Sequence, residues 1–388
     1  MRAGTAPSQR TRPSNGHLAS AGPAAVWPRA SALLVLGALL AACASPGAAP
    51  SPTAAPAKPA ASTAAVAPPV AAAPTAQSTP REPVRVVQAL PTRDFGFLPG
   101  VIAISKGFTA EEGIQLELPV MASNAAIPAI TNKEIQFASA GSGTRAAYQG
   151  APLKGVFYYY NQNTLIAVGA SDVRSYRDLP GKVLAIASPG SSEDWVIKLL
   201  LNREGIPVSD VQIAALGQGP QRVQALLAGQ VQFSVLNADL AVDLERQGYN
   251  VIGDVRTLMP IPWSGFVVHQ DLLREQPELI KRWIRAHIHA LQFMKQNPGE
   301  TAAIATRELG LDSALALRAV ELVLPAINDD DPGGFTEAGL LLNTQLDMEA
   351  LGMSGDPAQI GPSTQDVTLL RQVQRELGIR CTTGYQCQ

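Results

Sequence analysis

Short apolar runs recur along the chain from residue 83 onward, and helix-like segments separate most of them. In order between residues 84 and 270 they read VRVVQAL, IQLELPV, IQFASAG, LKGVFYYYN, TLIAVGA, VLAIA, VQIAALG, VQFSVLN, YNVIGDV and GFVVHQ. Runs of this length predict strands, and their alternation with helices predicts a parallel or mixed α/β sheet. From about Gln270 long amphipathic stretches such as PELIKRWIRAHIHALQFMKQN take over, so the carboxy-terminal third is expected to be helical.

The first 82 residues follow a different pattern. Residues 31–42, SALLVLGALLAA, form an apolar run behind several arginines, too short for a spanning helix of roughly 20 residues but typical of a signal peptide, which we place at 1–42. The sequence Leu-Ala-Ala-Cys ending at Cys43 resembles a bacterial lipobox, which would make Cys43 the lipidated first residue. An ordinary secretory signal with an incidental cysteine is the alternative. Residues 43–82, rich in Ala, Pro, Ser and Thr, are expected to form a disordered tether.

Composition narrows the classes of function. The chain has 388 residues, 46% of them hydrophobic and 16% charged, which allows two domains. A formal net charge of -2 without basic clustering predicts no nucleic-acid partner. Besides Cys43 the cysteines are Cys381 and Cys387, and either one small disulfide or two free thiols fits their spacing.

Motifs for catalysis are missing from the sequence. It contains no Gly-x-Ser-x-Gly elbow, phosphate loop, His-Glu-x-x-His or Cys-x-x-Cys. His287 and His289 are two residues apart on a predicted helix and do not share a face, so they are not expected to bind a metal together. We therefore expect no catalytic residue, no metal and no cofactor.

Two segments carry a family resemblance. Residues 190–252 read as a Gly-Ser turn and helix, a Leu-Leu-x-x-x-Gly-Ile ending, Asp-Val, a strand, then Arg-Val-x-Ala-Leu-x-x-Gly-Gln-Val. Residues 97–118, FLPGVIAISKGFTAEEGIQLEL, agree with the opening helix and second strand of the same family. The chain resembles solute-binding proteins of ABC importers in the nitrate, sulfonate, taurine and thiamine-pyrimidine (SsuA/THI5-like) group, from residue 83 to about 370. Gln232, where the family often has Asp, is a departure that reads as a surface change.

The resemblance implies an α/β, two-lobed, periplasmic-binding-protein-like fold of type II with two hinge crossings, near 165–170 and 263–268. Lobe 1 would comprise 83–170 and 263–380, lobe 2 would comprise 171–262, and 381–388 would be a tail. A small-molecule solute would bind between the lobes, and hinge closure would signal to an ABC permease. The expected protein is a monomeric lipoprotein, held to the outer face of the cell membrane through Cys43, with no chemistry of its own.

Two alternatives stay open. One branch resembling this fold is a pyrimidine synthase, but that branch carries a cysteine cluster beside its site, and this folded region has cysteines only at its extreme end. A solute-sensing lipoprotein that signals to a membrane receptor would have the same sequence features.

Ligands of open α/β sheets bind beyond the carboxyl ends of the strands, which selects the loops that hold candidate residues. The candidates are Arg93, Asp94, Phe97, Ser139, Gly141, Ser142, Thr144, Asn161, Gly190, Ser191, Ser192, Trp195, Asn237, Asp239 and Trp263. Contact through residues 190–192 is implied by the resemblance.

Each candidate also has a structural interpretation. Glycines can serve backbone geometry, Ser142 or Thr144 can cap a helix, and Phe97 and Trp195 can belong to the core. Trp263, beside a hinge, is the better candidate for stacking. Arg93 or Arg145 could pair with an anionic ligand or with Asp94.

Strand alternation and helix capping add two expectations. In the run Tyr158–Tyr160 alternation points only Tyr160 or Asn161 into the cleft. Ser191 is expected to cap the next helix, and Glu193 and Asp194 beside it disfavour a strongly anionic ligand, so a neutral or zwitterionic solute is favoured.

Overall fold

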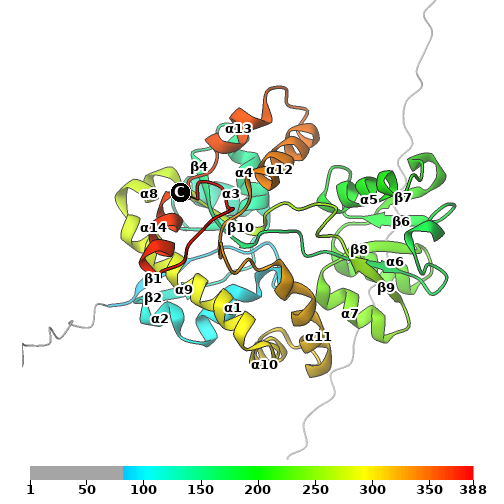
Figure 1. Cartoon of the computed structure of the whole chain (residues 1–388), viewed down its shortest axis with the longest axis horizontal. Coiled ribbons are helices and arrows are strands. Elements are labelled where there is room, and N and C mark those ends of the chain that lie inside the picture. The colour runs from blue at the N-terminus through cyan, green and yellow to red at the C-terminus, as the bar shows by residue number, and fades with distance from the viewer. Residues whose placement is uncertain (1–81, 388) are drawn as a thin grey trace, which may run out of the picture. The chain divides into compact units, whose positions relative to one another are not determined.

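The computed structural model describes residues 82–387, and its strands form two separate groups (Figure 1). The first group consists of β1 (Val84–Val87), β2 (Ile114–Glu117), β3 (Ala138–Ser139), β4 (Leu153–Tyr160) and β10 (Trp263–His269). β1 pairs in parallel with β2, and β10 lies antiparallel between β3 and β4. Backbone hydrogen bonds of Val87 and Ala89 to Phe137 join the two parts, which gives the order β2-β1-β3-β10-β4.

The second group is one five-stranded sheet in the order β7-β6-β8-β5-β9. Its strands are β5 (Ile166–Gly169), β6 (Val183–Ile186), β7 (Gln212–Ala215), β8 (Phe233–Leu236) and β9 (Asn250–Asp254). β5 is antiparallel to β8 and β9, whereas β6 is parallel to β7 and β8. Each group thus has one strand that runs antiparallel to the others, β10 in the first group and β5 in the second. Along the chain, β5 follows β4 of the first group, and β10 follows β9 of the second group.

Helices connect the strands within each group. The first part of the chain contains η1 (Phe95–Phe97), α1 (Leu98–Ser105), α2 (Phe108–Glu111), α3 (Ser123–Thr131) and α4 (Ala140–Tyr148). The second sheet carries η2 (Tyr176–Asp178), α5 (Ser192–Arg203), η3 (Val208–Asp210), α6 (Gly219–Leu227) and α7 (Ala238–Arg246). The strands that the apolar runs predict, and the helices between them, are confirmed.

The carboxy-terminal third is helical, as the amphipathic pattern predicts. It contains α8 (Gln270–Glu275), α9 (Pro277–Gln296), α10 (Pro298–Leu309), α11 (Ser313–Val323), η4 (Leu324–Ala326), α12 (Glu337–Ala350), α13 (Pro357–Ser363) and α14 (Thr368–Glu376). The apolar face of α9 packs on the first sheet, where fully buried Trp283 stacks on Phe137 at 4.1 Å between ring centroids. His287 lies buried on the same face, and burial lowers its pKa to about 3, so it is neutral.

The chain crosses between the two sheets twice, after β4 and after β9. The first crossing precedes Ile166, because β5 already belongs to the second sheet, a few residues before the boundary expected at 170. Helices of the last third also contact the second sheet's elements. Leu346 of α12 lies in the core beneath that sheet, and Arg318 of α11 pairs with Glu245 of α7 at 3.5 Å. The assignment of residues 263–380 to one lobe remains a prediction.

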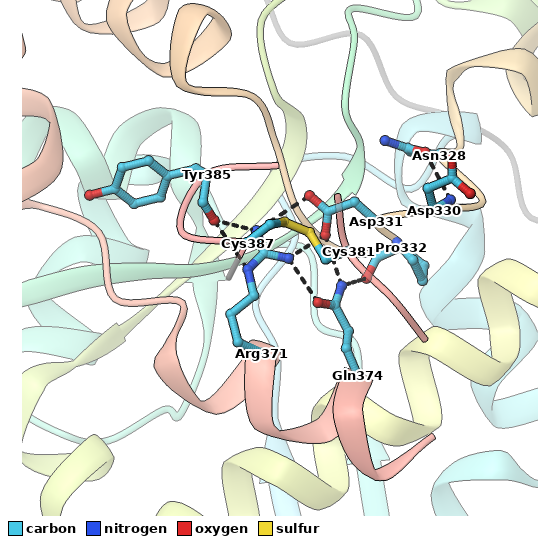
Figure 2. The surroundings of a disulfide bond; sticks show 9 residues. All are labelled: Asn328, Asp330, Asp331, Pro332, Arg371, Gln374, Cys381, Tyr385 and Cys387. Atoms are coloured by element: carbon cyan, nitrogen blue, oxygen red, sulfur yellow. Dashed lines mark hydrogen bonds and ion pairs between the residues drawn. A yellow bond between two sulfur atoms is a disulfide. The ribbon is translucent and has the colours of Figure 1, made fainter. Parts of the chain in front are cut away.

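A disulfide between Cys381 and Cys387 closes the carboxy-terminal tail. Of the two alternatives, the small disulfide is therefore confirmed and the two free thiols are not. Figure 2 shows Arg371 and Gln374 of α14 directed at Asp331 beside this loop. Gln374 Nε2 donates to Asp331 Oδ1 at 2.8 Å, and Arg371 forms a buried ion pair with the same carboxylate. The tail thereby covers a buried polar cluster and is fixed to α14.

Some expectations concern residues that the structure does not describe. The signal peptide at 1–42, Cys43 and nearly all of the tether lie outside the described range. Among the helices of residues 82–387, none combines the length and apolar character needed to cross a membrane.

Candidate functional site

A cavity of about 450 Å³ opens between residues of the two sheets. We call its two sides the first and the second wall. The first wall consists of Pro91–Asp94, Gly96, Phe97, Ser139–Gly141, Thr144, Arg145, Tyr158, Pro262–Gly265, Asn343 and Asp347. The second wall consists of Ser192, Glu193, Gln218–Pro220, Arg222, Asn237, Asp239 and Leu240. Its volume and its mixture of aromatic and polar groups fit a small organic ligand.

Asp94 lies in the first wall because it caps the short helix η1 that follows the first strand. Its Oδ1 accepts the Gly96 N–H at 2.9 Å, and its Oδ2 accepts the Thr92 hydroxyl at 2.7 Å. Burial raises the pKa of the Asp94 carboxyl, while these hydrogen bonds act in the opposite direction. The carboxylate is therefore held firmly in place but has little contact with water.

The first wall also contains an ion pair between two helices. Arg145 Nε of α4 donates to Asp347 Oδ1 of α12 at 2.7 Å, and Asn343 Nδ2 donates to Asp347 Oδ2 at 3.3 Å. Burial raises the pKa of Asp347, although the arginine opposes this. The alternative pairing of Arg145 with Asp94 is not found. Among the described residues, Arg93 forms no ion pair with an acid that lines the cavity, including Asp94. Its guanidinium instead lies 3.8 Å from Glu308.

The second wall begins at the amino-terminus of α5, where Ser191 is the N-cap, as predicted, and its Oγ accepts the Asp194 N–H at 3.3 Å. Asp194 turns away from the cavity, because its Oδ2 accepts the Gly190 N–H at 2.8 Å and Lys198 Nζ at 2.9 Å. Glu193 does line the cavity but is paired with Arg222 at 2.8 Å. The two acids therefore place no unpaired charge at this helix end.

Arg222 is the most deeply buried cation of the cavity, with a side chain 4% exposed. Besides Glu193 it donates to the Val235 carbonyl at 2.9 Å, and its Nε–H has no partner within the described residues. Burial lowers the pKa of Arg222, and Glu193 counteracts that effect. This arginine fixes α6 to the edge of β8 and leaves one donor free.

Asn237 and Asp239 at the start of α7 face the first wall. Asn237 Nδ2 donates to Asp94 Oδ2 at 2.7 Å, a hydrogen bond that connects the two walls across the cavity. Burial and then the charge of Asp94 raise the pKa of Asp239 to about 6. Oδ1 of Asp239 is shielded from solvent and has no hydrogen-bond partner in the described part of the chain.

Trp263 and Ser264 lie where the chain returns to the first sheet. Trp263 is half-buried and contacts the cores beneath both sheets. Ser264 has a φ of 51°, a left-handed conformation that serine adopts at a cost and that recurs at ligand sites. Gly265 follows, and a Cβ there would lie 2.1 Å from the Tyr158 ring, so only glycine lets this strand approach Tyr158.

Ten of the fifteen candidate residues line the cavity: Arg93, Asp94, Phe97, Ser139, Gly141, Thr144, Ser192, Asn237, Asp239 and Trp263. Their contact with a ligand stays a prediction. Thr144 does not cap its helix, since its hydroxyl donates to the Ala140 carbonyl at 2.6 Å.

The other five are Ser142, Asn161, Gly190, Ser191 and Trp195, and none is among the lining residues. Ser142 is half-buried outside the cavity lining, and the Asn161 N–H bonds the Ala326 carbonyl. Gly190 faces α12, since a Cβ there would lie 3.3 Å from the Ala350 Cβ, and Ser191 is the N-cap. Trp195 packs against the second core, with Lys198 Nζ 5.2 Å from its ring.

The tyrosine expectation is wrong in its position along the strand. Tyr160 is fully buried and donates to the Phe95 carbonyl at 2.9 Å, whereas Tyr158 lines the cavity. β4 is buried on both faces, so simple alternation does not assign a cleft face. The sequence also did not single out Arg222, Asn343 and Asp347. Two signals were available in the sequence. Arg222 is a charged residue on the apolar face of α6, and Asn343 and Asp347 are four residues apart on α12.

Metal-binding groups are sparse in residues 82–387. Asp331, Cys381 and Cys387 lie close enough together for a metal, but the disulfide occupies both sulfur atoms and none of the three lines the cavity. The chemistry that the cavity offers is hydrogen bonding, charge and aromatic contact.

Comparison with known proteins identifies the family. The NMT1/THI5 like family matches residues 94–301, more than half of the chain, and the protein belongs to this family. Among curated relatives, the riboflavin-binding protein RibY of Chloroflexus aurantiacus is 26% identical over 286 residues, which cover 68% of this chain and 80% of RibY.

Solved structures show the same fold. The periplasmic aliphatic sulphonate binding protein SsuA from Escherichia coli superimposes with a TM-score of 0.57 at 16% identity, over 74% of this chain and 96% of SsuA. A DszB structure in complex with biphenyl-2-sulfinic acid reaches 0.54 at 13% identity, over 75% of this chain and 99% of that one. The chain therefore has a mixed α/β periplasmic-binding-protein fold of type II, and this fold also includes the enzyme DszB. Two of these similar proteins, RibY and SsuA, are binding proteins by name.

Proposed function

We propose that the protein is an extracytoplasmic lipoprotein that captures a small organic solute in the cavity and delivers it to an ABC permease. The observation that carries the proposal is the cavity between the two walls. Its lining is polar and aromatic, and residues from both parts of the chain that the two crossings connect contribute to it. A solute that contacts both walls would favour their closed arrangement, which a permease can recognise. The lining contains neither histidine nor cysteine, so a serine–histidine or cysteine–histidine pair is not available there.

The proposed organisation has three parts. A signal peptide over 1–42 is removed, Cys43 carries the lipid, and the tether through residue 82 holds the folded lobes outside the membrane as a monomer. Lobe 2 corresponds to the second sheet and its helices, and lobe 1 to the rest.

Thermal-shift screening tests the binding function. We would screen nitrate, alkanesulfonates, taurine, pyrimidines and related heterocycles, with riboflavin included because RibY is similar over most of this chain. At least one compound is expected to raise the melting temperature, because a ligand that binds only the folded state stabilises it by mass action. If no compound does so and a panel member is instead consumed with steady turnover, the protein is an enzyme on this fold.

Membrane fractionation tests the anchor. Cys43→Ser is expected to move the protein from the membrane fraction to the soluble extracytoplasmic fraction, since the thiol is the acylated atom. Unchanged membrane association would contradict lipidation at Cys43.

The enzyme alternative is favoured only by the similarity to DszB. The cysteines of residues 82–387 are both in the tail disulfide and do not line the cavity, so a cysteine-based reaction has no nucleophile there. A solute-sensing lipoprotein would bind the same ligand, and co-purification with a permease or with a membrane receptor separates the two functions.

A further inference from the structure

The charges that line the cavity do not balance. Three arginines and four acids line it, and each arginine is already engaged: Arg93 with Glu308, Arg145 with Asp347 and Arg222 with Glu193. Two acids, Asp94 and Asp239, form no ion pair among the described residues. They lie on opposite walls, and Asn237, two residues before Asp239, hydrogen-bonds Asp94 directly.

Neither carboxylate is satisfied as an anion. Asp94 has neutral donors only, from Thr92, the Gly96 N–H and Asn237. Oδ1 of Asp239 has no donor among residues 82–387 and is shielded from water by them. A buried carboxylate without a counter-charge is unfavourable, and two of them within range of each other are more so. The raised pKa of Asp239, caused by burial and by Asp94, reports the same shortage of positive charge.

Resting on the proposed binding function, we propose that Asp94 and Asp239 form a subsite for a cationic nitrogen of the solute, such as a protonated amine or amidinium-type group. The bound molecule is thus a cation or a zwitterion. An ammonium or amidinium group provides several N–H donors and the missing charge, so from the cavity it can neutralise both Asp94 and Asp239. A sulfonate, carboxylate or nitrate group offers only acceptors and is repelled at this position.

Matched compound pairs test the proposal. Isothermal titration at pH 7.5 would compare tryptamine with tryptophol, 2-phenylethylamine with 2-phenylethanol and taurine with isethionate, each pair differing in amine against hydroxyl. These pairs would be run beside the screening panel described above. The proteins are the chain without its signal peptide and lipid, as wild type, Asp239→Asn and Asp243→Asn. Asp243 is the matched control, because it lies on the same helix, has a side chain that is 41% exposed and does not line the cavity.

The proposal predicts that the amine of at least one pair binds at least tenfold more tightly than its hydroxyl partner. Asp239→Asn should weaken amine binding at least tenfold, leave the hydroxyl compound within twofold, and remain folded by circular dichroism. Asp243→Asn should match wild type. If only anionic or neutral compounds bind, or if Asp239→Asn leaves amine affinity unchanged, the subsite is refuted while the binding function stands. If no compound of the panel or the pairs binds at millimolar concentration, both are refuted.

Discussion

Each wall of the cavity holds one arginine–carboxylate ion pair and one aspartate with no cation beside it, yet the walls bury these groups to different degrees. In the first wall Arg145 is 36% exposed and Asp94 has three hydrogen-bond donors. In the second wall Arg222 is 4% exposed and Asp239 has an oxygen without a partner. The aspartate of the first wall therefore has donors, one of them Asn237 of the second wall, whereas one oxygen of the aspartate of the second wall has no donor among the described residues.

The largest expected difference concerns the two ion pairs. Arg222→Met should lower the free energy of unfolding by about 3–5 kcal/mol, because it leaves Glu193 and the Val235 carbonyl without their buried donor. Arg145→Met should cost about 1–2 kcal/mol, since its guanidinium is partly solvated and Asp347 keeps Asn343. Urea denaturation measures both variants, and equal losses would remove the difference between the walls.

The two aspartates should differ next. With its pKa raised to about 6 in the folded state, ionised Asp239 costs stability, so Asp239→Asn should stabilise the ligand-free protein by roughly 3 kcal/mol at pH 7.5. The gain should shrink as pH falls from 6 toward 4, because the folded wild type then takes up the proton. Asp94→Asn should change stability by less than about 1 kcal/mol, since the hydrogen bonds to Asp94 offset much of its burial cost. Denaturation curves between pH 4 and 8 decide this, and a pH-independent gain for Asp239→Asn would contradict it.

Two tryptophans should separate binding from packing. Trp263→Ala should weaken binding of the best ligand about tenfold, roughly 1.4 kcal/mol, because it removes an aromatic surface of the cavity. Trp195→Ala, whose ring packs against the second core, should lower stability and leave affinity unchanged. Titration and melting curves of both variants would refute this assignment if Trp263→Ala bound as well as wild type.

The smallest effect concerns the hydrogen bond between the walls. Asn237→Ala should cost about 1 kcal/mol of stability in the ligand-free protein, the usual net value of one such bond. Asn132→Ala provides the control, because Asn132 is exposed and its side chain bonds only Glu134 among the described residues, at 3.4 Å. If the two variants unfold at the same urea concentration, the contact across the cavity contributes nothing to closure.

The fold was largely readable from the sequence because its signals are local. Each apolar run marks a strand, and a serine, a glycine and two acids mark the start of α5. Boundaries were less accurate: IQFASAG predicts a strand over 135–141, whereas β3 spans only Ala138–Ser139, because α4 begins at Ala140. A short strand pairing and a helix start compete there for the same residues.

The site was readable only in part, because its walls are completed by long-range contacts. Loops at strand ends gave Asp94, Asn237 and Asp239, in line with the general rule for open α/β sheets. Arg145 and Asp347 are more than 200 residues apart in the sequence, and nothing in the sequence near either residue indicates that they meet. Glu193 and Asp194 are both paired with cations, so the acids that bear on ligand choice are Asp94 and Asp239.

A variant that blocks the cavity shows whether the solute binds there. Gly141 lines it, and the nearest atom to a Cβ built there is Ser139 Oγ at 3.9 Å, so a Cβ fits there without a clash and Gly141→Trp would place an indole at the cavity. Gly299→Trp is the control, because Gly299 is exposed at the start of α10 with nothing near its Cβ position. Titrated with the strongest ligand from the screen, Gly141→Trp should lose at least 100-fold in affinity while Gly299→Trp binds like wild type. Equal affinity of a folded Gly141→Trp variant would show that the solute binds elsewhere.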